Sequence, residues 1–273
     1  MFNIELYYDD LDSESLIDNI KFDRSETFFN KAKNSFLDIL NIKKFLENRM
    51  VSGLDKSIGK IKNNLENYNK LDWSNFINEE VPVSVGFDTN LYMLSDFLND
   101  NILENFNKYK IFYNKIDIEL NKFIGDKEHR LQKLTFADNS KLDKDIKELS
   151  LLFNKLLNFK THELHVATIK DLVINKDGYG DTVNTTYNIL TSINENEYQT
   201  FVEMNRKLDM KLKVVYELIH TEEVVYSKEI IKALSSNITT LASYSTLIGK
   251  MILANYETSF ILLNIEKVIK HYE

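Results

Sequence analysis

Between residues 91 and 123 an apolar side chain recurs at every third or fourth position. The ten residues of this row are Leu91, Leu94, Leu98, Ile102, Phe106, Tyr109, Tyr113, Ile116, Leu120 and Phe123. Steps of three and four residues place one continuous apolar stripe along an α-helix. Such a helix would be about 50 Å long at a rise of roughly 1.5 Å per residue, so it needs packing partners along its whole length. The row predicts a long bundle helix that begins at a cap formed by Asp88 or Thr89 and is closed by Gly125.

Rows with the same spacing predict further helices, and two short segments alternate instead. The helical rows are expected over residues 25–53, 54–71, 142–156 with a continuation towards Val173, and 187–219. Apolar and polar residues alternate over 2–8 and 81–87, which predicts two short strands. The sequence at 175–181 is the strongest turn signal in the chain.

Glycine and proline are scarce, with 7 and 1 residues respectively, so few positions can interrupt a helix. This scarcity also disfavours an α/β enzyme, whose turns and phosphate loops use glycine. The predicted fold is mainly all-α: an elongated bundle of long antiparallel helices with a minor β element. Residues 1–87 would form an N-terminal arm, a helical hairpin and an extended segment, and 88–273 the long-helix bundle, unless 1–273 form one continuous domain.

The segment 233–265 is nearly free of charge. No charged residue lies between Lys232 and Lys250, and Glu257 is the only one from there to Glu266. A helix that is uncharged all round is normally surrounded by protein. We therefore expect this segment either to be the central helix of the bundle or to be covered by another subunit. Ala242, in its middle, should not tolerate a charge.

Composition excludes several functions. The chain has no cysteine, which excludes disulfides, thiolate metal sites and cysteine nucleophiles. Its net charge is −8 without a concentrated basic face, which disfavours nucleic-acid binding. The first twelve residues resemble no secretory signal, and no stretch of about 18 apolar residues suggests a membrane span.

Three short motifs resemble metal-binding signatures. Glu217-Leu-Ile-His220 matches the Glu-x-x-His element of di-iron bundles, and Asp126-Lys-Glu-His129 is a looser copy, with Asp126 expected to cap a helix start. His162-Glu-Leu-His165 is similar to the zinc-protease signature, but its histidines are three residues apart rather than four. Ordinary helical residues are the alternative interpretation of all three motifs.

Two further segments resemble ligand-binding loops incompletely. In Gly53–Ile61 the glycines Gly53 and Gly59 are separated by one residue too many for a phosphate loop, and Ile61 replaces the Ser or Thr that would bind magnesium. Counted as a calcium loop from Asn175, the closing Glu is replaced by Thr186. The sequence therefore assigns no catalytic, cofactor-binding or metal residue, no cofactor and no small-molecule substrate, and predicts that the chain is not an enzyme.

Two features of the sequence support a resemblance to a known class of proteins. Asn, Lys and Ile are frequent, and the segment Glu80-Val-Pro-Val-Ser-Val-Gly-Phe87 precedes a long predicted helix. In its middle third the chain resembles uncharacterised helical virion structural proteins of large tailed bacteriophages. The resemblance implies a structural or assembly subunit in the head, neck or tail of a virion, with itself or other structural proteins as partners. It assigns no functional residue. The strands at 2–8 and 81–87 would pair within one chain or between chains.

Two other functions compete with this expectation. A membrane-active bundle, like the α-helical pore-forming toxins, could store 233–249 inside a soluble fold, although the eight Ser, Thr and Asn residues in that segment oppose deep insertion. A di-iron helical enzyme would need the Glu217 and His220 motif to face other acids. Outside a virion the expected location is the cytoplasm.

Overall fold

The structure is a computed structural model that describes residues 53–84, 89–126, 139–157, 164–221 and 228–273. Within these ranges the chain forms seven α-helices and one two-stranded antiparallel sheet, which confirms a mainly all-α fold with a minor β element. The helices are α2 (Leu54–Tyr68), α3 (Leu91–Gly125), α5 (Ser140–Leu156), α6 (Ile169–Val173), α7 (Lys176–Ser192), α8 (Glu195–Thr221) and α9 (Lys228–His271). The strand expected at 2–8, the helix expected at 25–53 up to residue 52, and residues 127–138 lie outside the described residues.

Helix α3 is the predicted long helix, and all ten residues of its apolar row are buried. It ends at Gly125, as expected. The expected cap at Asp88 or Thr89 is wrong, because the side chain of Asn90 accepts a hydrogen bond from the Met93 N–H at 3.2 Å. Asn90 directly precedes the first residue of the apolar row, where a capping oxygen can reach the exposed amides of the first turn.

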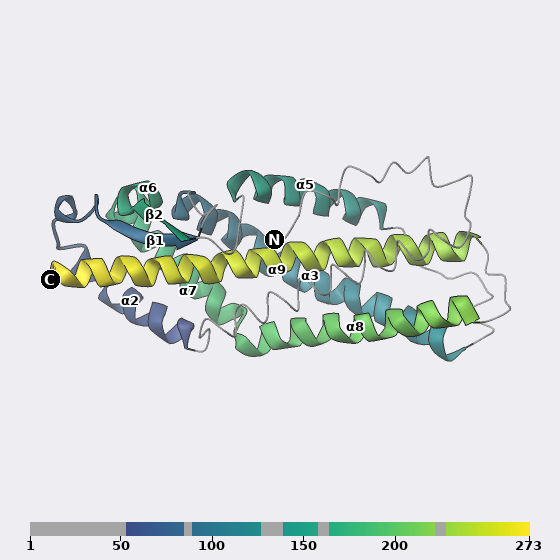
Figure 1. The fold of residues 1–273 in the computed structure, drawn as a ribbon. Coiled ribbons are helices and arrows are strands. Elements are labelled where there is room, and N and C mark those ends of the chain that lie inside the picture. Colours follow the sequence, from purple (N-terminus) through teal and green to yellow (C-terminus); the bar gives the residue numbers. More distant parts are fainter. Residues whose placement is uncertain (1–52, 85–88, 127–138, 158–163, 222–227) are drawn as a thin grey trace.

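Helix α9 has 44 residues and extends along the length of the bundle (Figure 1), antiparallel to α3. It contacts α2, α3, α5, α7 and the sheet. Every side chain over 251–259 is buried. The segment 233–265 is thus part of the central helix of the bundle. Other elements of the same chain cover it, which explains why it carries almost no charge.

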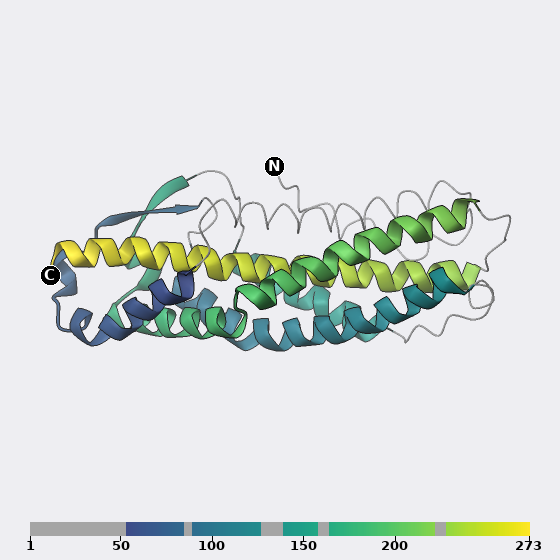
Figure 2. The same ribbon diagram turned by 90° about the horizontal axis from the view of Figure 1, so that it is seen from below.

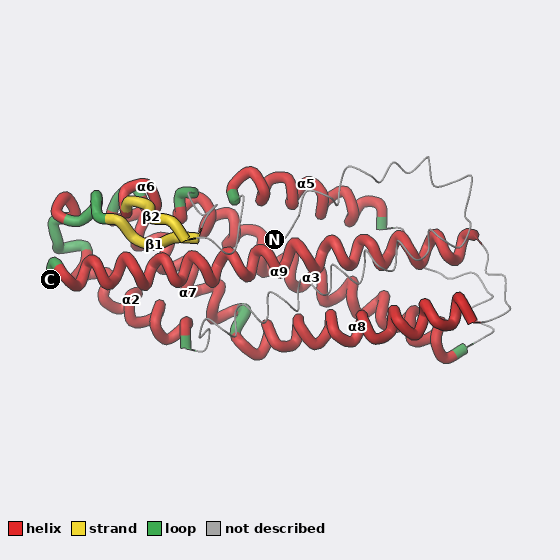
Figure 3. The backbone as a smooth tube through the Cα atoms, in the orientation of Figure 1, coloured by secondary structure: helices red, strands yellow, loops and turns green. Residues whose placement is uncertain are grey.

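A small sheet lies over the C-terminal half of α9 (Figure 3). Strand β1 (Glu80–Ser84) pairs antiparallel with β2 (Leu164–Thr168), with Pro82 opposite Val166. Val81 and Val83 are buried, and β1 contacts α9. The predicted continuation of the 142–156 helix towards Val173 is therefore wrong, since β2 and the short α6 occupy this stretch.

The single helix predicted over 187–219 is also wrong, because the chain breaks at Ile193 and Asn194 between α7 and α8. The Asn194 side chain accepts a hydrogen bond from the Glu197 N–H at 3.1 Å, which starts a new helix. The turn predicted at 175–181 is mostly wrong, because residues 176–181 form the start of α7. It is confined to Ile174, whose φ is 61°, and Asn175, whose side chain caps α7.

Gly178 in the first turn of α7 is needed because the backbone passes too close for a side chain. A Cβ at this position would lie 2.5 Å from the Val173 carbonyl oxygen, whereas a Cβ at Gly180 would meet nothing within 4 Å. We expect Gly178→Ala to lower the free energy of unfolding by about 1–3 kcal/mol. The matched Gly180→Ala should leave it unchanged or raise it by up to ~1 kcal/mol. Urea denaturation of both variants measures the difference, and equal effects would contradict the described start of α7.

Candidate functional site

A buried set of polar contacts lies where α3, α8 and α9 meet, at the fully buried Asn205 of α8. The Tyr109 hydroxyl of α3 donates to Asn205 Oδ1 at 3.1 Å, and the Ser245 hydroxyl of α9 donates to the same oxygen at 2.5 Å. Asn205 Nδ2 in turn donates to the Phe201 carbonyl at 2.7 Å. One amide thus joins three helices, and we call Tyr109, Asn205 and Ser245 the Asn205 cluster.

Aromatic side chains enclose this cluster. The Tyr109 ring packs edge-on against Phe201 and Tyr244, with ring centroids 5.2 Å and 5.9 Å away. The Tyr244 hydroxyl donates to Asn105 Oδ1 at 2.9 Å, which adds a second hydrogen bond between α9 and α3. Buried polar groups with complete hydrogen bonding favour one helix register over its alternatives.

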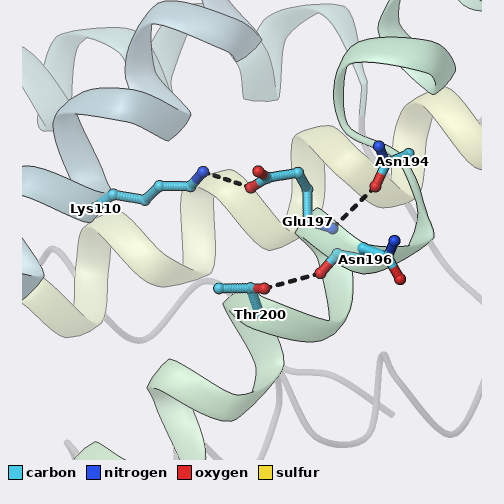
Figure 4. Close-up of polar contacts among 5 residues, drawn as sticks. All are labelled: Lys110, Asn194, Asn196, Glu197 and Thr200. Atoms are coloured by element: carbon cyan, nitrogen blue, oxygen red, sulfur yellow. Dashed lines mark hydrogen bonds and ion pairs between the residues drawn. The ribbon is translucent and has the colours of Figure 1, made fainter.

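Two ion pairs tie α3 to α8 nearer the solvent. Lys110 pairs with Glu197, and Lys211 pairs with Asp117; all four side chains are partly exposed. Figure 4 shows Lys110 reaching from α3 to Glu197 in the first turn of α8. The same turn is held by the Asn194 cap and by the Thr200 hydroxyl, which donates to the Asn196 carbonyl at 2.9 Å. Partly exposed pairs contribute little free energy, but they fix where α8 starts on α3.

A second polar group links α2 to the C-terminal part of α9. The Tyr68 hydroxyl donates to Glu266 Oε1 at 3.1 Å, and Lys270 Nζ lies 2.9 Å from the same oxygen. Trp73 Nε1 donates to the Tyr68 carbonyl at 3.0 Å. The mostly buried carboxylate of Glu266 is thus neutralised and hydrogen-bonded, as a buried charge requires.

Burial raises the pKa of the tyrosines in the core. It does so for Tyr109 and Tyr244, and it raises the pKa of Tyr256 to about 12, with the charges of Glu195 and Asp55 adding to the effect. These hydroxyls remain neutral near pH 7. They therefore act there as hydrogen-bonding groups rather than as titrating acids or bases.

The shifted pKa of Tyr256 predicts a loss of stability in alkali. The folded-state pKa of about 12 lies above the ordinary value of 10.0, so the contribution is intact below pH 10 and lost as pH rises through 12. The loss is about 1.4 kcal/mol per pH unit in that window. Between pH 9 and 11, Tyr256→Phe should lose about 1 kcal/mol less stability than the wild type in urea denaturation. Identical slopes for Tyr256→Phe and the wild type would contradict the prediction.

Of the predicted di-iron candidates, the described residues include the side chains of Glu217 and Asp126. Glu217 is exposed on α8, and the side chain of His220 lies outside the described residues. Asp126 does not start a helix: it is the C-cap of α3, and its N–H donates to the Lys122 carbonyl at 3.0 Å. Residues 127–129 are not described. Among the described residues no three His, Asp or Glu side chains are placed to hold a metal ion.

The other motif candidates lie in elements that do not suit the proposed chemistry. His165 is on strand β2, so the expected pair of helical histidines is wrong; His162 is not described. Gly59 lies inside α2, where a Cβ would be 3.1 Å from the Tyr187 ring, so this glycine serves close helix packing. Tyr179 is fully buried in α7, which places it away from solvent rather than in a calcium loop.

Sequence reasoning missed Asn205. It lies within the apolar row of α8, between Phe201 and Leu208, and a polar residue in such a row signals a buried hydrogen bond. Ser245 gives a weaker signal, because α9 contains many Ser and Thr residues.

The hydropathy of the described helices decides whether any of them could span a membrane. Across the described part of the chain, no helix combines the length and apolar character needed to cross a membrane.

Comparison with known proteins returned no match: no family model, no curated protein and no solved structure is significantly similar to this chain.

Proposed function

We propose that this protein is a non-enzymatic structural subunit of a multi-protein particle, and specifically a bacteriophage virion component of the head, neck or tail. In this role it contacts copies of itself and other structural proteins. The observation that carries the proposal is a set of large apolar side chains exposed in helical register on neighbouring helices. We call Ile111, Ile118, Met210 and Val214 the α3–α8 apolar set.

The spacing places these side chains on two outward faces. Ile111 and Ile118 are seven residues apart on α3, and Met210 and Val214 are four apart on α8, so each pair shares a helix face. All four are exposed, Ile111 at 59% and Met210 at 57%. Asp117, next to Ile118, forms an ion pair with Lys211, next to Met210, so the two helices run side by side there. Single exposed apolar residues are common, but a group in register favours a protein-binding surface.

The interior of the bundle supports the same role. The Asn205 cluster and the two α3–α8 ion pairs connect helices to one another, which is what a rigid framework requires. The elongated shape offers long side surfaces for contact with neighbours (Figure 2). The virion assignment itself comes from the sequence resemblance at 80–87 and the heavy use of Asn, Lys and Ile.

Light scattering of surface variants tests the proposal. Ile111→Lys/Ile118→Lys should reduce the molar mass of the associated protein, because two charges oppose burial of this face. The control is Leu151→Lys/Leu152→Lys on α5, where the side chains are equally exposed at 61% and 53%. Circular dichroism should show unchanged helicity in both. Association that survives the α3 substitutions as well as it survives the α5 substitutions would contradict the proposed surface.

A further inference from the structure

One outward face of α3 carries exposed side chains along almost the whole helix, and we call them the α3 outer row. Its nine members recur at every third or fourth position: Met93, Asp96, Asp100, Glu104, Lys108, Ile111, Lys115, Ile118 and Lys122. All nine are exposed. The spacing places them on one side of the helix over about 44 Å, opposite the buried apolar row. Figure 2 shows the C-terminal half of α3 along one long edge of the bundle.

The charges of the α3 outer row are separated by sign. The three acids Asp96, Asp100 and Glu104 come first, and the three lysines follow. The row is therefore negative towards the start of α3 and positive towards its end. Two of its apolar members, Ile111 and Ile118, lie in the positive half and also belong to the α3–α8 apolar set.

Interactions within α3 do not account for this separation. The helix macrodipole acts on charges in the first and last turns. The first turn of α3 contains no acidic residue, and the last turn contains only Lys122 as a basic one. Glu104 and Lys108 form an exposed pair at 2.5 Å, and Lys122 pairs with Glu119 outside the row at 2.8 Å. Such local pairs contribute little free energy and can be exchanged for others.

We propose that the α3 outer row binds the same row of a second copy, with the two helices antiparallel about a two-fold axis beside position 109. This arrangement brings the acidic half of each row to the basic half of the other. Asp96 then lies opposite the partner's Lys122, and Glu104 lies opposite the partner's Lys115. The two-fold symmetry repeats both pairs. The inference rests on the proposed structural role, because it names the partner of the α3–α8 apolar set.

The antiparallel arrangement is the one that the charges favour. A parallel pair would set like charges opposite each other along the whole row, which costs several kcal/mol in an interface. The net charge of −8 also opposes non-specific association of two copies, so a local match of opposite charges is needed. Near the axis, Ile111 packs against the aliphatic stem of the partner's Lys108, and Met210 and Val214 of α8 flank the contact.

Charge reversal with complementation tests this pairing by light scattering. Asp96→Lys/Glu104→Lys and Lys115→Glu/Lys122→Glu each set like charges opposite one another at all four pairs. Either variant alone should therefore raise the dissociation constant of the dimer at least ~100-fold. An equimolar mixture of the two variants should associate like the wild type, because every pair in the mixed dimer again joins opposite charges.

A matched control separates pairing from a change in net charge. Lys141→Glu/Lys144→Glu on α5 reverses two exposed lysines as well and should leave association unchanged. Circular dichroism checks that each variant is folded.

The outcomes distinguish this inference from the proposed function. A wild-type protein with the mass of one chain at every concentration would contradict both the proposed self-association and this dimer. A wild-type oligomer that neither α3 reversal weakens would overturn the α3 pairing alone. Loss of association in both variants without recovery on mixing would also overturn it, and would show that the row binds a different surface.

Discussion

Ala242→Glu should unfold much of the protein or reduce its stability by at least about 3 kcal/mol. Ala242 is 4% exposed on α9, the central helix, between the buried residues Leu241 and Tyr244. The substitution adds both volume and a carboxylate without a partner, and each alone is costly in a packed core. Because a domain is stabilised by only ~5–15 kcal/mol, the loss should be visible as a lower urea midpoint by circular dichroism.

The matched control on the same helix is Lys232→Glu, at an exposed position near the start of α9. It introduces the same side chain and should change the free energy of unfolding by no more than ~0.5 kcal/mol. Equal midpoints for the two variants would contradict the central placement of α9.

Asn205→Leu should lower the free energy of unfolding by about 2–4 kcal/mol, although it conserves side-chain volume. The leucine removes the acceptor shared by Tyr109 and Ser245, so two buried hydroxyls lose their hydrogen bond. A buried polar group left without a partner costs more than the hydrogen bond contributed while it existed. Urea denaturation measures the loss.

Removing the orphaned hydroxyls in the same chain should restore stability. The triple variant Tyr109→Phe/Asn205→Leu/Ser245→Ala replaces all three members of the Asn205 cluster with apolar groups, so no donor remains unsatisfied. It should recover more than half of the loss caused by Asn205→Leu. A triple variant less stable than the single one would show that the cluster stabilises the bundle through packing rather than hydrogen bonding.

The two longest helices could be predicted because their signals are local and extended. The ten-residue row of α3 repeats one spacing over 33 positions, and every member is buried. The segment 233–265 carries only Lys250 and Glu257 over a comparable distance, a pattern typical of a helix enclosed by its own fold or by a partner. Both patterns gave the bundle architecture without knowledge of any long-range contact.

The missed features depend on contacts between distant parts of the chain or on a single residue. Strand β2 has five residues, and its partner Glu80–Ser84 lies about 80 positions earlier, so no local periodicity identifies it. The break between α7 and α8 depends on Asn194 acting as a cap, although the apolar spacing continues across it. Asn205 becomes a junction only because Tyr109 and Ser245 arrive from other helices. The candidate metal motifs contain residue types that bind metal ions, but nothing in the sequence indicates that the fold places these residues close together.

The first measurement should be the molar mass of the full-length, natively purified protein by light scattering over a range of concentrations, with metal content determined on the same sample. A structural subunit that uses the α3–α8 apolar set should give a defined oligomer well above the 32.1 kDa of one chain and carry no stoichiometric metal. A constant mass of one chain at every concentration would contradict self-association through this surface. Bound iron in such a monomer would favour the di-iron alternative and direct attention to Glu217 and His220.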